Sequence, residues 1–85
     1  MNGSLMTKPE LWDGLNKVFR DVMDVPGISV GESTTANDIE EWDSITHVLL
    51  IVAVEKRFSV KFTAEEIRSL QNVGQLAVLI ERKSL

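Results

Sequence analysis

The chain has 85 residues, which is room for one domain with one hydrophobic core. Its formal net charge of -4 disfavours nucleic acid as a partner, because that binding depends on Lys and Arg side chains that neutralise phosphates. It contains no cysteine, which excludes disulfides, thiolate metal sites and a nucleophilic thiol of its own.

The longest apolar run, residues 48–54, is much shorter than the roughly 20 residues of a membrane span. A signal peptide has a basic stretch followed by an apolar one, and the N-terminus shows no such pattern. We therefore expect a cytoplasmic protein with no membrane span. We also expect a flexible lead-in over residues 1–6, with Met1 or Met6 as the natural start, and a single domain over residues 7–85.

The first predicted element is an amphipathic helix over residues 7–25. Thr7 and Glu10 have the spacing of a capping box, and Pro26-Gly27 breaks the pattern. Gly14 inside the helix predicts a close approach of another helix. The apolar stripe consists of Leu11, Trp12, Leu15, Val18, Phe19, Val22 and Met23.

Residues 26–42 have little periodicity and several Gly, Ser, Thr and Asn residues, which predicts a long surface loop. A loop of this length in a small domain is more often functional than not. We expect Ile28, Val30 and Ile39 to attach it to the core.

A second helix is predicted over residues 43–58, with Asp43 as its N-cap. Its apolar residues cover more than one face, so the helix is either central or exposes part of its apolar surface to a partner. These residues are Ile45, Val48, Leu49, Leu50, Ile51, Val52, Val54 and Phe58.

Two more helix starts are predicted at Thr63, with Glu66 completing a capping box, and at Asn72, with Gln75. The resulting fold class is all-α, with three longer helices and one short third helix. The predicted core combines Leu11, Leu15, Val18, Phe19, Val22, Leu50, Ile51, Val54, Phe58, Ile67, Leu70, Val73, Leu76 and Ile80.

Ser44 is the first candidate for chemistry, because it lies at the first turn of a helix just after the long loop. Free backbone N–H groups and the helix dipole favour a phosphate at such a position. The alternative is that Asp43 and Ser44 are only a capping pair, since serine is common at helix starts.

The motif Asp43-Ser44-Ile45 at the head of an apolar helix resembles the attachment motif of acyl and peptidyl carrier proteins. Residues 42–48, 55–58, the Val60-x-Phe62 link and residues 72–77 are also similar to that family, so the resemblance covers essentially the whole chain. It implies a four-helix bundle of the acyl-carrier type with a long loop between helices 1 and 2, and a specialised free-standing member.

The resemblance also implies the function. A phosphopantetheinyl transferase would use coenzyme A and Mg²⁺ to place 4'-phosphopantetheine on Ser44, with Asp43 and Ile45 as neighbouring cofactor-binding residues. The thiol of the arm would carry acyl groups as thioesters between acyl-loading, elongating and acyl-transferring enzymes. On this reading the chain is a monomeric carrier, not an enzyme, with no catalytic residue. Fatty-acid, polyketide, amino-acid and dedicated lipid or saccharide pathways all remain open.

Two departures from the fatty-acid type of carrier stand out. Glu41-Trp42 precedes the Asp-Ser pair where a glycine is usual, and Leu49 and Lys56 replace acids of the following helix. The acids instead gather before the helix. We therefore hypothesise that partners read this acidic loop end together with an apolar patch; the alternative packs the apolar residues into the core. The partner-binding candidates are Glu40, Glu41, Trp42, Val48, Leu49 and Val52.

His47 lies one turn after Ser44. A protonated imidazole there could contact the phosphate of the arm, and the alternative is an ordinary solvated surface histidine. Trp42 either shields the arm or packs the loop. The spacing of Asp38, Glu40, Glu41 and Asp43 matches no calcium loop, so we expect no metal.

A second function stays open, in which a small helical adaptor binds a partner through its apolar second helix without a prosthetic group. A serine enzyme is disfavoured, because the chain has one histidine, no nucleophile elbow and too few residues for a substrate cavity with an oxyanion hole.

Overall fold

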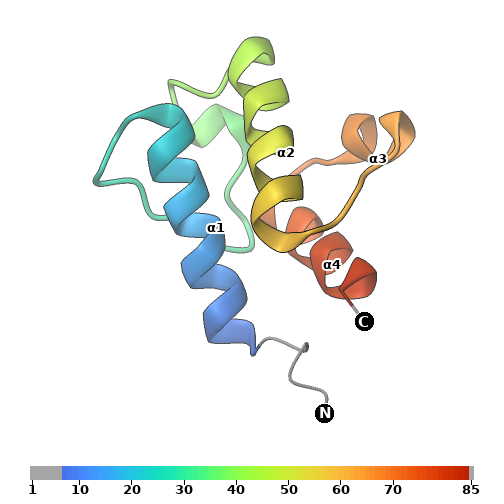
Figure 1. Cartoon of the computed structure of the whole chain (residues 1–85). Helices are drawn as coiled ribbons and strands as arrows, with labels where there is room; N and C mark the ends of the chain where they lie inside the picture. Colours follow the sequence, from blue (N-terminus) through green and yellow to red (C-terminus); the bar gives the residue numbers. More distant parts are fainter. Residues whose placement is uncertain (1–6, 85) are drawn as a thin grey trace.

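The computed structural model describes residues 7–84, and within them every regular element is a helix, as predicted. The helices are α1 (Lys8–Met23), α2 (Ser44–Phe58), the short α3 (Ala64–Ser69) and α4 (Val73–Lys83) (Figure 1). The lead-in predicted for residues 1–6 lies outside the described residues. No helix within residues 7–84 is long and apolar enough to span a bilayer.

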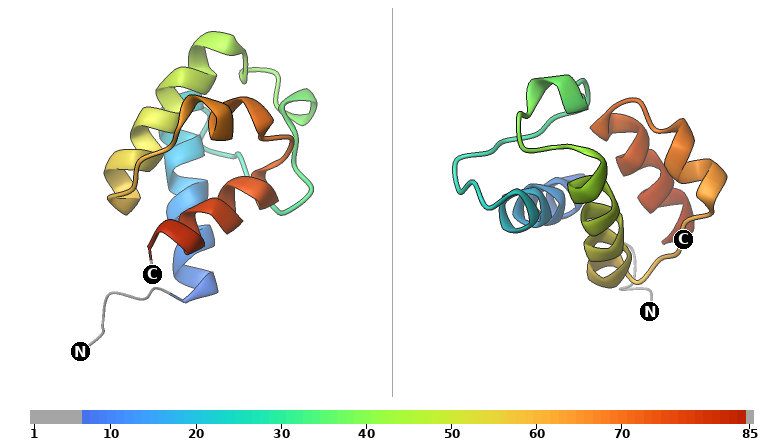
Figure 2. Two further views of the ribbon diagram at one scale, coloured as in Figure 1. Left: turned by 90° about the vertical axis from the view of Figure 1, so that its right-hand side faces the viewer. Right: turned by 90° about the horizontal axis from the view of Figure 1, so that it is seen from above.

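The helix α2 lies between α1 on one side and the α3–α4 pair on the other (Figures 1 and 2). The chain runs up α1 and back down α2, so these two helices are antiparallel, and the loop that joins them passes around one side of the molecule (Figure 1). This central place of α2 explains why its sequence is apolar on more than one face.

The predicted helix starts are confirmed by hydrogen bonds. Thr7 and Glu10 form the capping box of α1, and Asp43, Thr63 and Asn72 cap α2, α3 and α4. The predicted end of α1 at residue 25 is wrong by two residues. The helix ends at Met23 because Asp24 adopts a left-handed conformation (φ 59°) and its N–H donates to the carbonyl of Arg20.

The core forms between α1, α2 and α4, and most of the predicted core residues are buried in it. Four predicted members, Val22, Phe58, Ile67 and Leu70, are only half-buried. They lie near the end of α1, at the end of α2 and on the short α3 with its following link, where fewer neighbours surround a side chain. The buried residues are Leu11, Leu15, Val18, Phe19, Met23, Val30, Ile39, Leu50, Ile51, Val54, Val73, Leu76, Ala77 and Ile80.

Gly14 confirms the close approach predicted from its place inside α1. A Cβ atom at this position would lie 2.9 Å from Cζ of Phe58, the last residue of α2. The absence of a side chain at residue 14 therefore lets the Phe58 ring lie against the backbone of α1.

The loop between α1 and α2 is attached to α1 by Asn16 and by Arg20, whose Nε donates to the carbonyl of Ile28 at 2.8 Å. The backbone N–H of Val30 donates to Oδ1 of Asn16 at 2.6 Å, and Nδ2 of Asn16 donates to the carbonyl of Trp12 at 2.9 Å. Val30 and Ile39 are buried as predicted, while Ile28 is half-buried. The loop also contains a 3₁₀ turn, η1 (Ala36–Asp38), that the sequence analysis missed.

The same loop reaches the start of α4. The backbone N–H groups of Val73 and Gly74 donate to the carbonyls of Thr34 and Glu32, at 2.9 and 3.0 Å. These N–H groups belong to the first turn of α4, where a helix has no internal acceptors for them. The loop thus completes the N-terminus of a helix that lies forty residues further along the chain.

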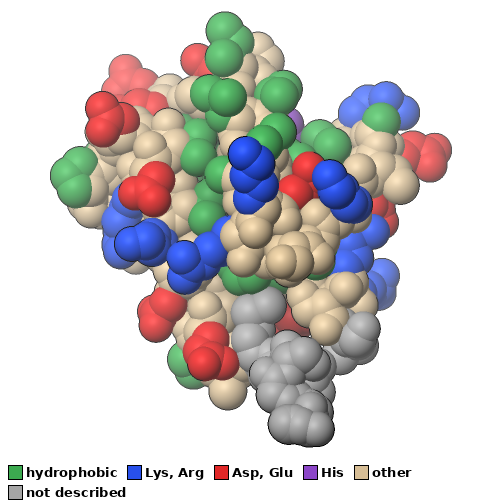
Figure 3. Space-filling model, viewed as in Figure 1, with side chains coloured by type: hydrophobic (Ala, Val, Ile, Leu, Met, Phe, Trp, Pro, Cys, Tyr) green, Lys and Arg blue, Asp and Glu red, His purple; other side chains and the backbone are tan. Residues whose placement is uncertain are grey.

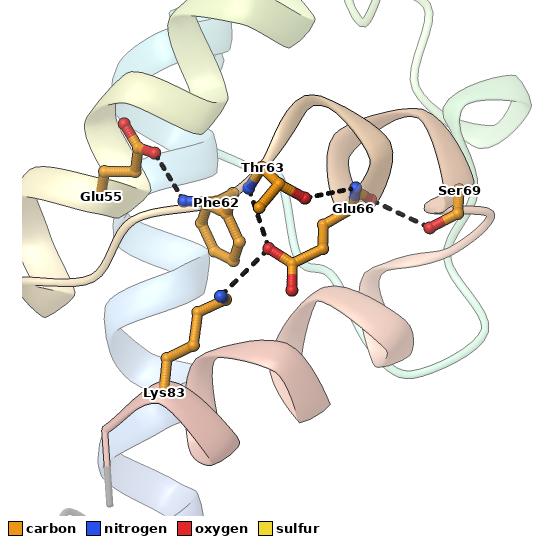
Figure 4. A network of polar contacts seen from close by, with 6 residues as sticks. All are labelled: Glu55, Phe62, Thr63, Glu66, Ser69 and Lys83. Atoms are coloured by element: carbon orange, nitrogen blue, oxygen red, sulfur yellow. Dashed lines mark hydrogen bonds and ion pairs between the residues drawn. The ribbon is translucent and has the colours of Figure 1, made fainter.

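The helix α3 is held by a group of polar contacts that also involves α2 and α4 (Figure 4). Glu66 accepts from the backbone N–H of Thr63 at 2.9 Å and pairs with Lys83 of α4 at 3.0 Å. Glu55 of α2 accepts from the backbone N–H of Phe62 at 2.9 Å. A helix of six residues is too short to be stable alone, so these contacts fix its place.

Candidate functional site

Ser44 is the first residue of α2, and its side chain is exposed. Within residues 7–84 its hydroxyl takes part in no hydrogen bond, whereas the neighbouring Asp43 and Thr46 complete a capping box around it. The two residues therefore divide the roles that the sequence left open: Asp43 caps the helix, and the hydroxyl of Ser44 is accessible and unengaged.

Asp43 accepts from the backbone N–H groups of Ile45 and Thr46 through a single carboxylate oxygen, at 3.0 and 2.9 Å. The N–H of Thr46, with its hydroxyl and the N–H of Ile45, holds the pKa of the Asp43 carboxyl below its ordinary value. Two of the amides that a phosphate was expected to use, those of Ile45 and Thr46, are thus already occupied by a negatively charged side chain.

A pocket of about 360 Å³ opens beside Ser44. Its walls come from α2, from the end of the long loop, and from the link between α3 and α4 with the first turns of α4. Most of the lining is apolar, and its polar groups are gathered around Ser44 and on the link. The lining residues are Ala36, Trp42, Asp43, Ser44, His47, Leu50, Leu70, Gln71, Asn72 and Leu76.

Trp42 and His47 form a pair in the wall of this pocket. Nε1 of Trp42 donates to Nδ1 of His47 at 3.1 Å, and the Trp42 ring also meets Phe19 edge to face, with centroids 5.1 Å apart. A protonated imidazole has no free acceptor nitrogen, so the charged His47 that the sequence left open is not the form that makes this contact. His47 is half-buried rather than a freely solvated residue.

The apolar candidates from the sequence analysis lie on a face of α2 that does not line the pocket. Ile45, Val48, Leu49 and Val52 are 72%, 61%, 54% and 44% exposed, so they stand outside the core. They share one stripe of α2, and Figure 3 shows apolar side chains along its upper part. Ile45 belongs to this stripe and does not line the pocket.

The acidic candidates Glu40 and Glu41 are exposed on the segment that enters α2. The carbonyl of Glu41 accepts from the hydroxyl of Thr46 at 2.8 Å, which fixes the backbone of this segment to the first turn of the helix. The carboxylate of Asp38 accepts from the backbone N–H of Thr35 and serves η1. Glu40 and Glu41 thus lie close to Ser44 along the chain and are open to contact.

Sequence reasoning missed the far wall of the pocket. Leu70 and Leu76, like Leu50 of α2, were expected only as core, Asn72 was expected only as a helix cap, and Gln71 was given no role. No local pattern reports this wall, because it forms where two distant segments meet. The turn η1 had a signal that was overlooked, since Thr35 and Asp38 repeat the spacing of Thr7 and Glu10.

A larger depression of about 690 Å³ runs along α4, but Ser44 does not line it. It includes Lys8 and Trp12 of α1, Glu66 of α3 and Arg82 of α4, and its one serine, Ser69, donates its hydroxyl to the backbone carbonyl of Glu66. The smaller pocket beside Ser44 is therefore the candidate site.

Comparisons with known proteins identify the family of this chain. Residues 13–80 match the family described as "Phosphopantetheine attachment site". The chain is 29% identical over 69 residues to an acyl carrier protein of Acidothermus cellulolyticus, covering 81% of this chain and 82% of the relative. It is 24% identical over 78 residues to one of Kineococcus radiotolerans, covering 92% and 96%.

The fold is similar to the solution structure of a holo acyl carrier protein from Geobacter metallireducens. The TM-score is 0.80 and the sequences are 44% identical, over 88% of this chain and 85% of that one. The chain therefore belongs to the acyl carrier family of proteins with a phosphopantetheine attachment site, whose cofactor is covalent 4'-phosphopantetheine.

Proposed function

We propose that residues 7–85 form a single carrier domain in which the Ser44 hydroxyl bears the phosphopantetheine arm. The observation that carries this proposal is the place of Ser44, exposed and unengaged at the head of α2 and at the rim of the pocket. The arm supplies a thiol that holds an acyl group as a thioester. The chain itself has no cysteine that could do so.

The protein's own residues present the serine rather than activate it. His47 cannot take the proton of Ser44 through Nδ1, because that nitrogen accepts from Trp42. The base that deprotonates Ser44 would belong to the phosphopantetheinyl transferase. There the serine oxygen would form a bond to the β-phosphorus of coenzyme A as 3',5'-ADP leaves. This division of labour fits a carrier that is not an enzyme.

Intact mass tests the attachment site. Incubation with coenzyme A, Mg²⁺ and a transferase of broad specificity should add one phosphopantetheine to the wild type and none to Ser44→Ala. Ser29→Ala, which changes an exposed serine of the long loop, is the matched control and should be modified fully. A mass gain that persists in Ser44→Ala would assign the arm to another residue.

We also propose that partner enzymes dock on a surface made of the Glu40-Glu41 loop end and the exposed stripe of α2. A stripe of large apolar side chains costs solubility when nothing covers it, which supports a role in binding. Lys56 continues the same stripe toward the end of α2, so the surface changes from acidic to apolar to basic along its length. This order of acidic, apolar and basic parts supports a specialised carrier, because a complementary partner surface can dock on it in one orientation only.

The docking surface is tested with acyl-loading and acyl-transferring enzymes encoded near this protein. Glu40→Lys with Glu41→Lys should lower kcat/KM for such an enzyme, and more so at low ionic strength, because exposed charges are screened by salt. Glu65→Lys, on the exposed side of α3, is the control. Unchanged turnover with every cognate enzyme would refute the acidic part of the surface.

The adaptor without a prosthetic group is the alternative, and the exposed stripe of α2 is the observation that favours it. The mass experiment separates the two functions. A chain that no transferase modifies, but that still binds a partner through Val48 and Leu49, would be an adaptor.

A further inference from the structure

The Trp42–His47 contact fixes which nitrogen of His47 carries a proton. The indole nitrogen of tryptophan donates only, so Nδ1 of His47 must accept, at 3.1 Å. The imidazole is then neutral, and its single proton lies on Nε2. The direction of one hydrogen bond thus leaves His47 with one free donor.

The core holds this pair in place. The Trp42 ring packs edge to face on Phe19, which is fully buried in α1, and the backbone N–H of Trp42 donates to the carbonyl of Ile39 at 3.1 Å. The rings of Trp42 and His47 are inclined by only 21°. Trp42 therefore holds the His47 ring in one orientation as well as in one tautomer.

The backbone N–H groups that follow Ser44 in the first turn of α2 are already used. The N–H groups of Ile45 and Thr46 donate to Asp43, and the N–H of His47 donates to the carbonyl of Asp43 at 2.8 Å. The hydroxyl of Thr46 donates to the carbonyl of Glu41. A phosphodiester on Ser44 would meet the Asp43 carboxylate in the place where a helix N-terminus usually offers amides.

His47 lies three residues after Ser44, so the two Cβ atoms are on one face of α2 and roughly 5–6 Å apart. Both residues line the same pocket. Resting on the proposed attachment at Ser44, we propose that Nε2–H of neutral His47 donates a hydrogen bond to a phosphodiester oxygen of the arm, with Trp42 as the residue that fixes the donor. This bond directs the arm over the pocket mouth and away from the exposed stripe.

The nitrogen resonances of His47 and the phosphorus resonance of the holo-protein test this inference together. In the wild type at neutral pH, the proton should reside on Nε2. His47→Leu should displace the phosphorus resonance, and His47→Gln, whose amide restores a donor, should return it toward the wild-type position. Trp42→Phe should remove the constraint on the tautomer, so that either nitrogen of His47 can carry the proton. The phosphorus resonance should then move part of the way toward its position in His47→Leu.

Val78→Ala is the control, since Val78 is exposed on α4, outside both the pocket and the stripe of α2. Its phosphorus resonance should stay at the wild-type position. A proton on Nδ1 in the wild type would overturn the inference, and so would a His47→Leu resonance displaced no further than that of Val78→Ala. Failure to form any holo-protein, seen by mass, would instead refute attachment at Ser44.

Discussion

The backbone N–H of Gly74 donates to the carbonyl of Glu32 at 3.0 Å, and a Cβ atom at residue 74 would lie only 2.6 Å from that same oxygen. The long loop therefore lies against α4 at a place where only glycine fits. Because the neighbouring atom is backbone, no side-chain rotation can relieve the contact.

Gly74→Ala should destabilise the protein. The higher helix propensity of alanine contributes at most about 1 kcal/mol, while overpacking of this kind costs about 1–3 kcal/mol. The free energy of unfolding from urea denaturation measures the net loss. Gly27→Ala is the control, because nothing lies within 4 Å of a Cβ atom there. Equal stability of Gly74→Ala and wild type would show that the loop can leave α4 without cost.

Asn16→Ala should loosen the loop at Val30, while Arg20 still donates to the carbonyl of Ile28. The change removes the acceptor for the N–H of Val30, a buried residue, and an unsatisfied buried donor costs about 1–3 kcal/mol. Urea denaturation would measure the loss, and amide exchange at Val30 would locate it. Lys17→Ala, at the next and exposed position, should change neither. Continued protection of the Val30 amide in Asn16→Ala would contradict this account.

Asp43 makes the stability of the protein depend on pH in the acid range. Its pKa is lower in the folded state than in the unfolded chain, because the N–H groups of Thr46 and Ile45 and the hydroxyl of Thr46 bind the carboxylate. The stabilisation is complete above the unfolded value of about 3.9 and is lost as the pH falls through the folded value.

Asp43→Asn should remove this part of the acid dependence, since the amide oxygen still caps but does not titrate. The difference in unfolding free energy between wild type and variant should be constant above about pH 5 and shrink below about pH 4. A difference that stays constant down to pH 2 would show that Asp43 does not contribute through its charge.

The pocket beside Ser44 should take up the first part of a bound acyl chain, because Leu50, Leu70 and Leu76 offer it an apolar wall. Amide shifts of these residues should then change with the length of the chain on the arm. Leu70→Trp should reduce those changes by filling the pocket. Val78→Trp is the control, since Val78 is exposed on α4 and does not line this pocket. Spectra that are independent of chain length would argue against an acyl pocket.

Helix starts could be predicted because each depends on residues three positions apart. Thr7, Asp43, Thr63 and Asn72 all cap the helices that the sequence assigned to them. Short local patterns of this kind also place Ser44 at the head of α2. The motif around Ser44 and the order of the helices could therefore be predicted without any knowledge of tertiary contacts.

Most of the features that escaped prediction join distant parts of the chain. Asn16 looks like a polar residue on the outer face of α1, yet it binds the loop at Val30. Nothing local indicates that Glu32 and Thr34 lie at the start of α4. The half-burial of Phe58 likewise depends on its neighbours outside α2, such as Gly14 of α1, and no pattern within α2 encodes them.

The two backbone hydrogen bonds between the long loop and α4 can report on the opening of the pocket. Asn72 and Leu76 of its far wall flank the amides of Val73 and Gly74, which donate to the loop. Any outward movement of this wall that admits an acyl chain would strain or open those bonds. Exchange of these two amide protons with solvent, residue by residue, would therefore record how often the empty carrier opens before its cargo arrives.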